Sequence, residues 1–261
     1  MICIDQLGRE IEFLKPPKRI VSLVPSQTEL LVSLGLSDNI VGVTKFCVHP
    51  KAIRTQKAIV GGTKKVDYEK IKKLNPDIIL CNKEENTKEI VAYLQEEYPV
   101  HVSDIFSISE ALEMIKQYGE IFNKKTEATA LISKIRLEKE SFDDFVSTMP
   151  QKRVAYFIWK DPWMVTGKDT FVDYLLKANR FINVFDDKKR YPEVSKEELS
   201  SIQDLDLIML SSEPYPFSEK HIDELANISN AKVILVDGEY FSWYGSRLAQ
   251  AFSYFKTLHE V

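Results

Sequence analysis

The sequence predicts an α/β fold with two lobes, whose parallel-type sheets are flanked by helices and joined by one long backbone helix. Short apolar runs alternate with amphipathic segments, a pattern typical of parallel sheets covered by helices. The alternation occurs on both sides of residues 120–149, which contain neither Gly nor Pro. Apolar residues recur there at helical spacing, so the segment would form a rod of roughly 40 Å. The alternative is a long surface helix on a single domain.

The first half begins with a small hairpin over residues 5–13. The apolar run over residues 19–24 is typical of a buried parallel strand, and Pro25 ends it. Ser26 and Glu29 have the spacing of a capping box that opens a helix, which Gly35 ends. The strands predicted next are Ile40–Val43, 77–81 and Val100–Ser103. Helices are predicted at 67–74, before Tyr98, and from Ser107 to Gly119.

The second half repeats this order. Strands are predicted at 153–159, 206–210 and 232–236, with helices at 170–178, after Ser195, and at 246–258. The predicted division is an N-terminal α/β lobe at 1–105, linking helices that include the backbone helix at 106–150, and a C-terminal α/β lobe at 151–261.

Composition narrows the classes of function. The 261 residues carry 35 Lys and Arg against 39 Asp and Glu, so the basic excess of a nucleic-acid-binding protein is absent. No apolar run approaches the roughly 20 residues of a membrane span, so we expect no direct insertion. No secretory leader is visible, which leaves either a cytoplasmic protein or a removed leader. The widely spaced Cys3, Cys47 and Cys81 predict buried thiols rather than disulfides.

One internal similarity concerns two surface carboxylates. Residues 68–80 resemble residues 196–210, and both read as a capped helix that leads into a buried strand. Glu69 and Glu197 each lie two residues before the first apolar helix position, so each lobe should present one carboxylate at an equivalent place. Their simplest role is to complement a helix dipole, which contributes about 0.3–1 kcal/mol each.

Four motifs follow one another along the chain: Pro25-Ser-Gln-Thr-Glu29 with the strand before it, Asn75-Pro-Asp77 with the helix before it, Thr166-Gly-Lys168 and Tyr191-Pro-Glu-Val-Ser-Lys-Glu197. In residues and order they resemble those of class III periplasmic binding proteins. This family comprises the ABC-importer receptors for cobalamin, haem and ferric siderophores, and the cobalamin receptors are the most similar group. The resemblance covers nearly the whole chain and implies two lobes that hold a small metal chelate in the cleft between them. It further implies a periplasmic or extracytoplasmic receptor that is not an enzyme, needs no cofactor and delivers its ligand to an ABC permease dimer. We expect a monomer.

The family resemblance also implies roles for particular residues. Glu69 and Glu197 match the carboxylates, one per lobe, that dock onto arginines of the permease. Phe46 aligns with an aromatic residue that contacts the corrin, whereas Tyr191 replaces a tryptophan. Thr63 and Asn82 stand where the cobalamin receptor has two further tryptophans, which weakens the case for cobalamin.

Other candidates follow from residue chemistry. Trp159, Trp163, Tyr240, Trp243 and Tyr244 lie at predicted strand ends or loops and suit a flat apolar ligand, with core packing as the alternative for each. The full predicted ligand-binding set is Pro25, Ser26, Phe46, Cys47, His49, Thr63, Asn82, Trp163, Tyr191, Trp243, Tyr244 and Arg247.

Charged and soft side chains add two hypotheses. Arg247 and Lys45 could bind an anionic edge of the ligand, and surface placement is the alternative. Cys47 and His49 could reach the metal centre of a bound chelate. His101, His221 and His259 are scattered without carboxylate spacing, so we expect no metal site of the protein's own.

Two rival functions stay open at this point. An enzyme would need chemistry that the sequence scarcely offers, because it has no G-x-G-x-x-G or G-x-S-x-G and residues 165–169 fail as a phosphate loop. Cys47 and His49 could still serve as nucleophile and base. A cytoplasmic ligand sensor of the same fold would explain the missing leader.

Overall fold

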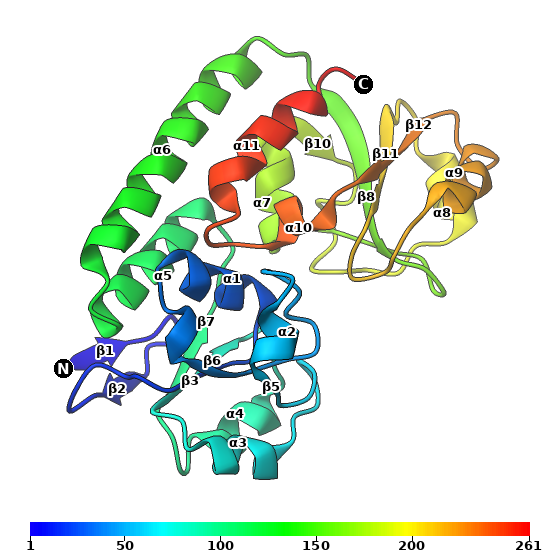
Figure 1. Cartoon of the computed structure of the whole chain (residues 1–261). Coiled ribbons are helices and arrows are strands. Elements are labelled where there is room, and N and C mark those ends of the chain that lie inside the picture. Colours follow the sequence, from blue (N-terminus) through cyan, green and yellow to red (C-terminus); the bar gives the residue numbers. More distant parts are fainter. The chain divides into compact units, whose positions relative to one another are not determined.

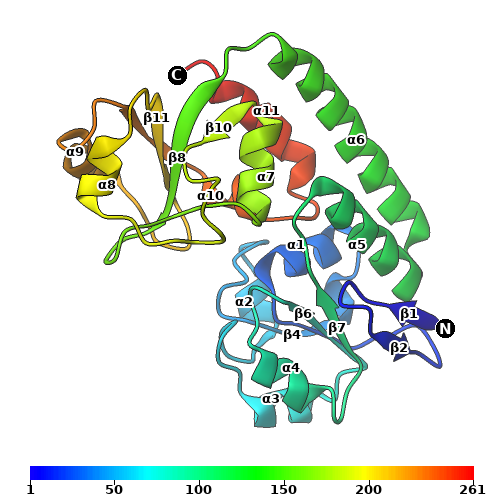
Figure 2. The same ribbon diagram turned by 180° about the vertical axis from the view of Figure 1, so that it is seen from behind.

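A computed structural model describes all residues, 1–261, and divides them into two compact units. Unit 1 comprises Met1–Arg136 and Trp243–Ala249, and unit 2 comprises Leu137–Ser242 and Gln250–Val261. Figures 1 and 2 show the elements from opposite sides. The units are bounded differently from the predicted lobes, because the predicted linker at 106–150 is divided between them after Arg136 and a segment near the C-terminus belongs to unit 1.

Unit 1 is built on a five-stranded parallel sheet in the order β5-β4-β3-β6-β7. Its strands are β3 (Ile20–Ser22), β4 (Ile40–Val43), β5 (Ala58–Ile59), β6 (Ile78–Asn82) and β7 (Val100–Ser103). Its short helices are α1 (Pro25–Ser33), the 3₁₀ helix η1 (Ser37–Asn39), α2 (Ile53–Gln56), α3 (Tyr68–Leu74) and α4 (Lys88–Leu94), followed by α5 (Ile108–Ile121). A separate antiparallel hairpin pairs β1 (Ile2–Ile4) with β2 (Glu10–Glu12).

Unit 2 contains a second parallel sheet in the order β10-β8-β11-β12, with β9 antiparallel to β8. Its strands are β8 (Lys152–Trp159), β9 (Met164–Val165), β10 (Phe181–Asn183), β11 (Leu207–Ser211) and β12 (Lys232–Val236). Its helices are α7 (Phe171–Ala178), α8 (Lys196–Ser201), α9 (Glu219–Ala226), α10 (Gly238–Ser242) and most of α11 (Leu248–Thr257).

The two sheets repeat one topology down to individual hydrogen bonds. The order β4-β3-β6-β7 in unit 1 corresponds to β10-β8-β11-β12 in unit 2, and all these pairs are parallel. Asp77 accepts a 3.0 Å hydrogen bond from the Arg19 amide, and Asp206 accepts the equivalent 2.6 Å bond from the Arg153 amide. In each unit this carboxylate ties the start of one central strand to the next, so the similarity seen in the sequence reflects one repeated structural element.

The long helix predicted over residues 120–149 is interrupted near its start, so its residues belong to two helices. α5 continues through Gly119 to Ile121, and α6 (Lys125–Ser147) begins after Asn123, whose φ of +55° breaks the helix. Gly119 permits a close approach, because a Cβ there would lie 2.6 Å from the Cβ of Ala128. At 23 residues, α6 is about 35 Å long, and the chain passes from unit 1 to unit 2 within it.

Apolar side chains of both sheets form the two cores. β3 and β6 are buried along their whole lengths, as expected for central parallel strands. Cys47 and Cys81 are buried free thiols, as predicted, and Cys3 is half-buried. No helix is both long enough and apolar enough to cross a bilayer.

Candidate functional site

The carboxyl ends of the unit 1 strands carry most of the predicted ligand residues. β3, β4 and β6 are parallel neighbours, so the loops that follow them meet at one edge of the sheet. This edge carries Pro25 and Ser26 at the start of α1, the loop of Phe46 and His49, and the loop after Asn82. The segment Trp243–Ala249, here called the returning segment, also packs in this unit.

The start of α1 differs from the sequence prediction. The N-cap is Val24, which makes no side-chain cap bond, and Pro25 is at the first helical position, where its fixed φ suits a helix. Ser26 is therefore inside the helix and is buried rather than capping it. The Thr28 hydroxyl bonds back to the Val24 carbonyl at 3.0 Å. The predicted capping box of Ser26 and Glu29 is wrong, because the Glu29 carboxylate binds a different partner.

That partner is Arg247 of the returning segment. The Arg247 guanidinium donates two hydrogen bonds to Glu29, from Nε at 3.1 Å and from an Nη at 2.7 Å. The two side chains are 11% and 23% exposed. This fork-to-carboxylate geometry is strong and directional, and it holds the returning segment against α1. Arg247 was predicted to contact an anionic group of the ligand, but its guanidinium is hydrogen-bonded to Glu29.

Aromatic rings of the returning segment also pack on unit 1. The Trp243 ring lies under the Arg247 guanidinium at 4.8 Å and meets the His49 ring edge-on, with centroids 5.3 Å apart. Gly245 makes the turn possible, since its φ of +127° disfavours any side chain. The structure thus brings His49 and Trp243, two of the predicted ligand residues, into contact, and Trp243 is largely buried.

Tyr244 is buried over a polar network that the sequence did not reveal. Gln27 is the centre of this network: its Nε2 donates to Ser103 Oγ at 2.7 Å, and its Oε1 accepts from the Tyr118 hydroxyl at 2.8 Å. Burial raises the pKa of the Tyr244 phenol, and the Glu85 carboxylate raises it further. The phenol therefore stays protonated at neutral pH.

Phe46 is the most exposed aromatic residue of the predicted set. Its side chain is 50% exposed, and its ring lies over Gly62, where a Cβ would come within 3.1 Å of the ring. The Lys45 ammonium lies 5.0 Å from the ring centroid. This pair presents an apolar face and a positive charge side by side.

Cys47, by contrast, does not reach the surface. Its thiol lies between the hydroxyls of Thr28, at 3.2 Å, and Thr44, at 3.3 Å. Burial raises the pKa of the thiol, which keeps it protonated. The hypothesis of Cys47 as a ligand of a metal centre, or as a nucleophile, is therefore not supported. No group of three or more His, Cys, Asp or Glu side chains is arranged to hold a metal ion.

Asn82 and Thr63 are also buried, and their contacts are internal. The Asn82 Oδ1 accepts from the backbone amides of Glu84 and Glu85 at 2.9 and 3.1 Å. The Thr63 carbonyl accepts from the Asn86 side chain at 3.0 Å. These groups shape the loop after β6 rather than offering a surface to a ligand.

That loop presents a carboxylate that sequence reasoning missed. Glu85 is half-buried near Tyr244 and Cys47, and burial raises its pKa while Lys64 opposes the increase. The available signal was its position, three residues after a buried strand of a parallel sheet, where ligands commonly bind.

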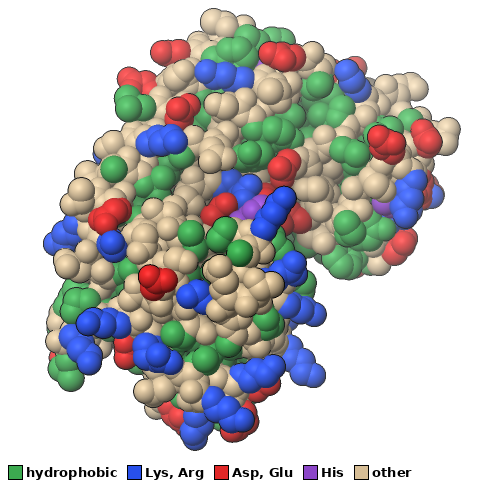
Figure 3. All heavy atoms as spheres, viewed as in Figure 1, with side chains coloured by type: hydrophobic (Ala, Val, Ile, Leu, Met, Phe, Trp, Pro, Cys, Tyr) green, Lys and Arg blue, Asp and Glu red, His purple; other side chains and the backbone are tan.

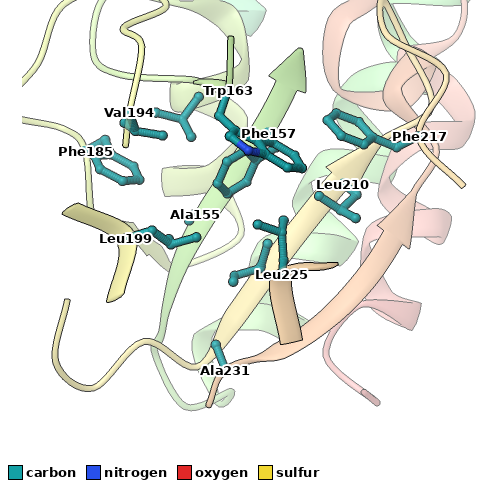
Figure 4. Close-up of a cluster of buried hydrophobic side chains, with 12 residues drawn as sticks. Ala155, Phe157, Trp163, Phe185, Val194, Leu199, Leu210, Phe217, Leu225 and Ala231 are labelled. Carbon is teal, nitrogen blue, oxygen red and sulfur yellow. The ribbon is translucent and has the colours of Figure 1, made fainter. Parts of the chain in front are cut away.

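In unit 2, Trp163 belongs to the core, contrary to the prediction. It stacks on Phe217 at 6.0 Å with an interplanar angle of 6°, and it meets Phe157 edge-on at 5.6 Å (Figure 4). The antiparallel strand β9 follows Trp163 directly and folds the ring back over β8. Packing in the core thus accounts for this aromatic residue.

The remaining aromatic candidates of unit 2 are more accessible. Trp159 is 40% exposed at the end of β8 and meets Tyr215 edge-on at 5.5 Å. Tyr191 is half-buried with Arg190 over its ring at 5.7 Å, and Tyr240 stacks on Tyr254 at 4.7 Å. Trp159 therefore offers the largest free ring surface among these residues.

Glu69 and Glu197 occupy equivalent places in the repeated element. Each is exposed at the second position of a short helix, α3 or α8, that leads into the corresponding central strand. The helices are capped by Asp67 and Ser195, which accept from the third helical amide at 3.0 and 3.1 Å. Its own backbone amide and the Ser195 hydroxyl lower the pKa of Glu197, so the carboxylate is ionised at neutral pH.

Comparisons with known proteins give a consistent answer. A family model described as "Periplasmic binding protein" matches residues 20–230. The "Uncharacterized ABC transporter substrate-binding lipoprotein YvrC" of Bacillus subtilis is 26% identical over 94% of this chain and 81% of its own. The "Vitamin B12-binding protein" of Vibrio vulnificus is 25% identical over 70% of this chain and 68% of its own.

Solved structures support the same fold. The periplasmic haem-binding protein RhuT of Roseiflexus sp. RS-1, in its apo form, superposes with a TM-score of 0.81 at 20% identity, over 93% of this chain and 98% of RhuT. The family model spans most of the chain, from the first residue of β3 to the loop before β12. The chain therefore belongs to the periplasmic binding protein family.

Proposed function

We propose that this protein is the substrate-binding component of an ABC importer and that it captures a small metal chelate, such as a corrinoid, haem or a ferric siderophore. The repeated placement of Glu69 and Glu197 is the observation that carries this proposal. Two ionisable side chains at the same position of the same element, one per unit, suit docking to a partner built from two similar halves. The relatives' names support the ligand class, since they include proteins for vitamin B12 and haem.

The ligand would bind the exposed part of the unit 1 sheet edge. Phe46 and Lys45 supply an apolar face next to a positive charge, with His49 and Trp243 beside each other in the same unit. A flat chelate can stack on Phe46, which contributes about 0.5–1.5 kcal/mol beyond area burial. Lys45 is exposed and can pair with an anionic edge of the ligand, whereas the Arg247 guanidinium is already bound to Glu29. This reduces the ligand-contact set in unit 1 to residues that retain accessible surface.

Replacing Phe46 tests this surface. Phe46→Ala should weaken ligand binding by about 2- to 13-fold, which corresponds to the stacking energy given above. Tyr93→Ala is a matched control, because Tyr93 is 53% exposed on α4 of the same unit. Equal losses in the two variants, measured by isothermal titration, would contradict the assignment of Phe46.

The docking role needs a separate test with transport as its readout. Glu69→Ala combined with Glu197→Ala should leave ligand affinity unchanged and abolish ligand uptake through the cognate permease, since charge-assisted contacts orient partners. The matched control combines Glu89→Ala with Glu219→Ala, which removes one exposed first-turn glutamate from each unit. Normal uptake by the Glu69 and Glu197 variant would refute the docking role.

We further propose that the protein carries its ligand without transforming it and works outside the cytoplasm. The protonated, buried Cys47 thiol offers no nucleophile at the sheet edge, which favours binding over catalysis. The name of the YvrC relative, a lipoprotein, favours an extracytoplasmic location. Recovery of the ligand chemically unchanged from the purified complex would support capture alone.

A further inference from the structure

Positive charge is concentrated in one stretch of unit 1. Residues 44–73 contain nine of the 35 Lys and Arg residues but only two of the 39 Asp and Glu residues. The rest of the chain is left with 26 basic and 37 acidic residues, so it is acidic. A protein with a net charge of -4 thus carries one strongly basic segment.

The fold gathers this segment at one edge of the sheet. α2 leads through Lys57 into β5, the edge strand that pairs with β4. The loop after β5 runs back along it, with the Asp67 amide bonded to the Val60 carbonyl at 2.8 Å. α3 follows, and its Lys70 ammonium reaches the Ile59 carbonyl at 3.5 Å. Figure 3 shows blue side chains gathered over the surface that α2 and α3 form in Figure 1.

Six of the eight lysines in this stretch have no carboxylate within ion-pair distance. Lys70 and Lys72 have acidic neighbours, at 3.7 and 4.0 Å. Two of the six make other contacts: Lys45 lies over the Phe46 ring, and the Lys64 ammonium donates to the Glu84 carbonyl. The other four lie on the flanks of α2, in the loop after β5 and at the end of α3, and all are exposed except one that is half-buried. We name them the lysine face: Lys51, Lys57, Lys65 and Lys73.

The residue types indicate the kind of partner. Eight of the nine basic residues are lysines, which act as hydrated point charges, whereas arginine provides the planar fork used in shaped, bidentate recognition. Point charges spread over two helices and a loop fit a surface of diffuse negative charge. We propose that the lysine face binds the headgroup surface of an anionic phospholipid bilayer. Each lysine near such a surface strengthens partitioning about fivefold.

This interaction goes beyond ligand capture and does not depend on it. Glu69 lies on α3 next to Lys70 and close to the lysine face in sequence. Contact with the bilayer would bring this carboxylate to the level of a membrane permease, a consequence that does rest on the proposed function. Vesicle binding and ligand binding are measured separately, so each proposal can fail without the other.

The test uses the full chain and vesicles of known composition. Wild type is sedimented with vesicles of phosphatidylcholine alone and with vesicles that contain about 30% phosphatidylglycerol as the anionic lipid. The face variant changes each residue of the lysine face to Gln. The control variant makes four Lys→Gln changes at exposed positions outside it, Lys125, Lys134, Lys220 and Lys232, and so has the same net charge. Equal thermal midpoints verify that both variants fold.

We expect wild type to bind only the anionic vesicles, and to lose binding at about 1 M salt, where the Debye length is about 3 Å. The face variant should lose about 100-fold or more in partitioning, and the control no more than about fivefold. Absence of wild-type binding at about 0.01 M salt would overturn the proposal. Equal losses in the two variants would also overturn it. A third result would also overturn it: wild type does not bind vesicles, and the face variant transports ligand poorly through the permease. The lysine face would then bind a protein partner.

Discussion

The pair of Arg247 and Glu29 offers a sharp test of how unit 1 is completed. The change is Arg247→Met, which keeps an unbranched side chain over Trp243 and removes the guanidinium. In the wild type the fork makes two hydrogen bonds to Glu29, and its charge lies 4.8 Å from the Trp243 ring. The two hydrogen bonds join the returning segment to Glu29, 218 positions earlier, so no local structure can replace them. The contact with Trp243 lies within the segment itself.

The magnitude follows from exposure and geometry. A charge-assisted hydrogen bond contributes about 1.5–3 kcal/mol, and the cation–π contact at a partly exposed site adds about 0.5–1 kcal/mol. Water can reach Glu29, whose side chain is 23% exposed, so the unpaired carboxylate is partly solvated in the variant. We therefore expect a loss of about 2–3 kcal/mol in the free energy of unfolding of unit 1.

The assay is urea denaturation with hydrogen exchange followed in the returning segment. The matched control is Lys139→Met, which breaks an exposed i,i+4 pair with Asp143 on α6 and should cost at most about 0.5 kcal/mol. A double-mutant cycle with Glu29→Gln should give a coupling energy above about 1 kcal/mol. A cost for Arg247→Met no larger than that of Lys139→Met, with unchanged exchange, would refute the reasoning.

Two further predictions concern packing and pH. Gly119→Ala should lower the free energy of unfolding by about 1–3 kcal/mol despite the better helix propensity of Ala, because the new Cβ would lie 2.6 Å from the Cβ of Ala128. In a denaturation series, adding Ala128→Gly should restore most of this loss. Burial, followed by the nearby Lys152, lowers the pKa of His259 to about 4. The unfolded chain therefore binds more protons between pH 6.5 and 4, so wild type should lose stability as the pH falls through that window, and His259→Phe should lose less. Parallel pH profiles of wild type and the His259 variant would contradict the second prediction.

Features encoded locally in the sequence were predictable. The alternation of buried strands and short helices identified both sheets, because central parallel strands must be apolar on both faces. The likeness between the segments of Glu69 and Glu197 was real, since both segments fold into the same helix and strand with the same carboxylate tie at Asp77 and Asp206.

Features that depend on distant residues were not predictable. Glu29 has the spacing of a capping box, but its carboxylate binds Arg247, 218 positions later. Asn123 breaks the long helix by adopting a left-handed backbone without Gly or Pro nearby to signal it. Trp163 was a candidate ligand contact at a predicted strand end or loop, with core packing as the alternative, and β9 folds it into the core. Sequence spacing alone could not distinguish an exposed aromatic ring from one that is buried in the core.

The most direct test of the central claim is a thermal-unfolding panel of the purified protein with cobalamin, haem and several ferric siderophores. A ligand present at about 100 times its dissociation constant adds about 2.7 kcal/mol to the stability of the native state. At about 2–4 °C per kcal/mol for a chain near this size, the midpoint should rise by about 5 °C or more with one class of chelate. No shift with any metal chelate would contradict the account of this protein as a metal-chelate receptor.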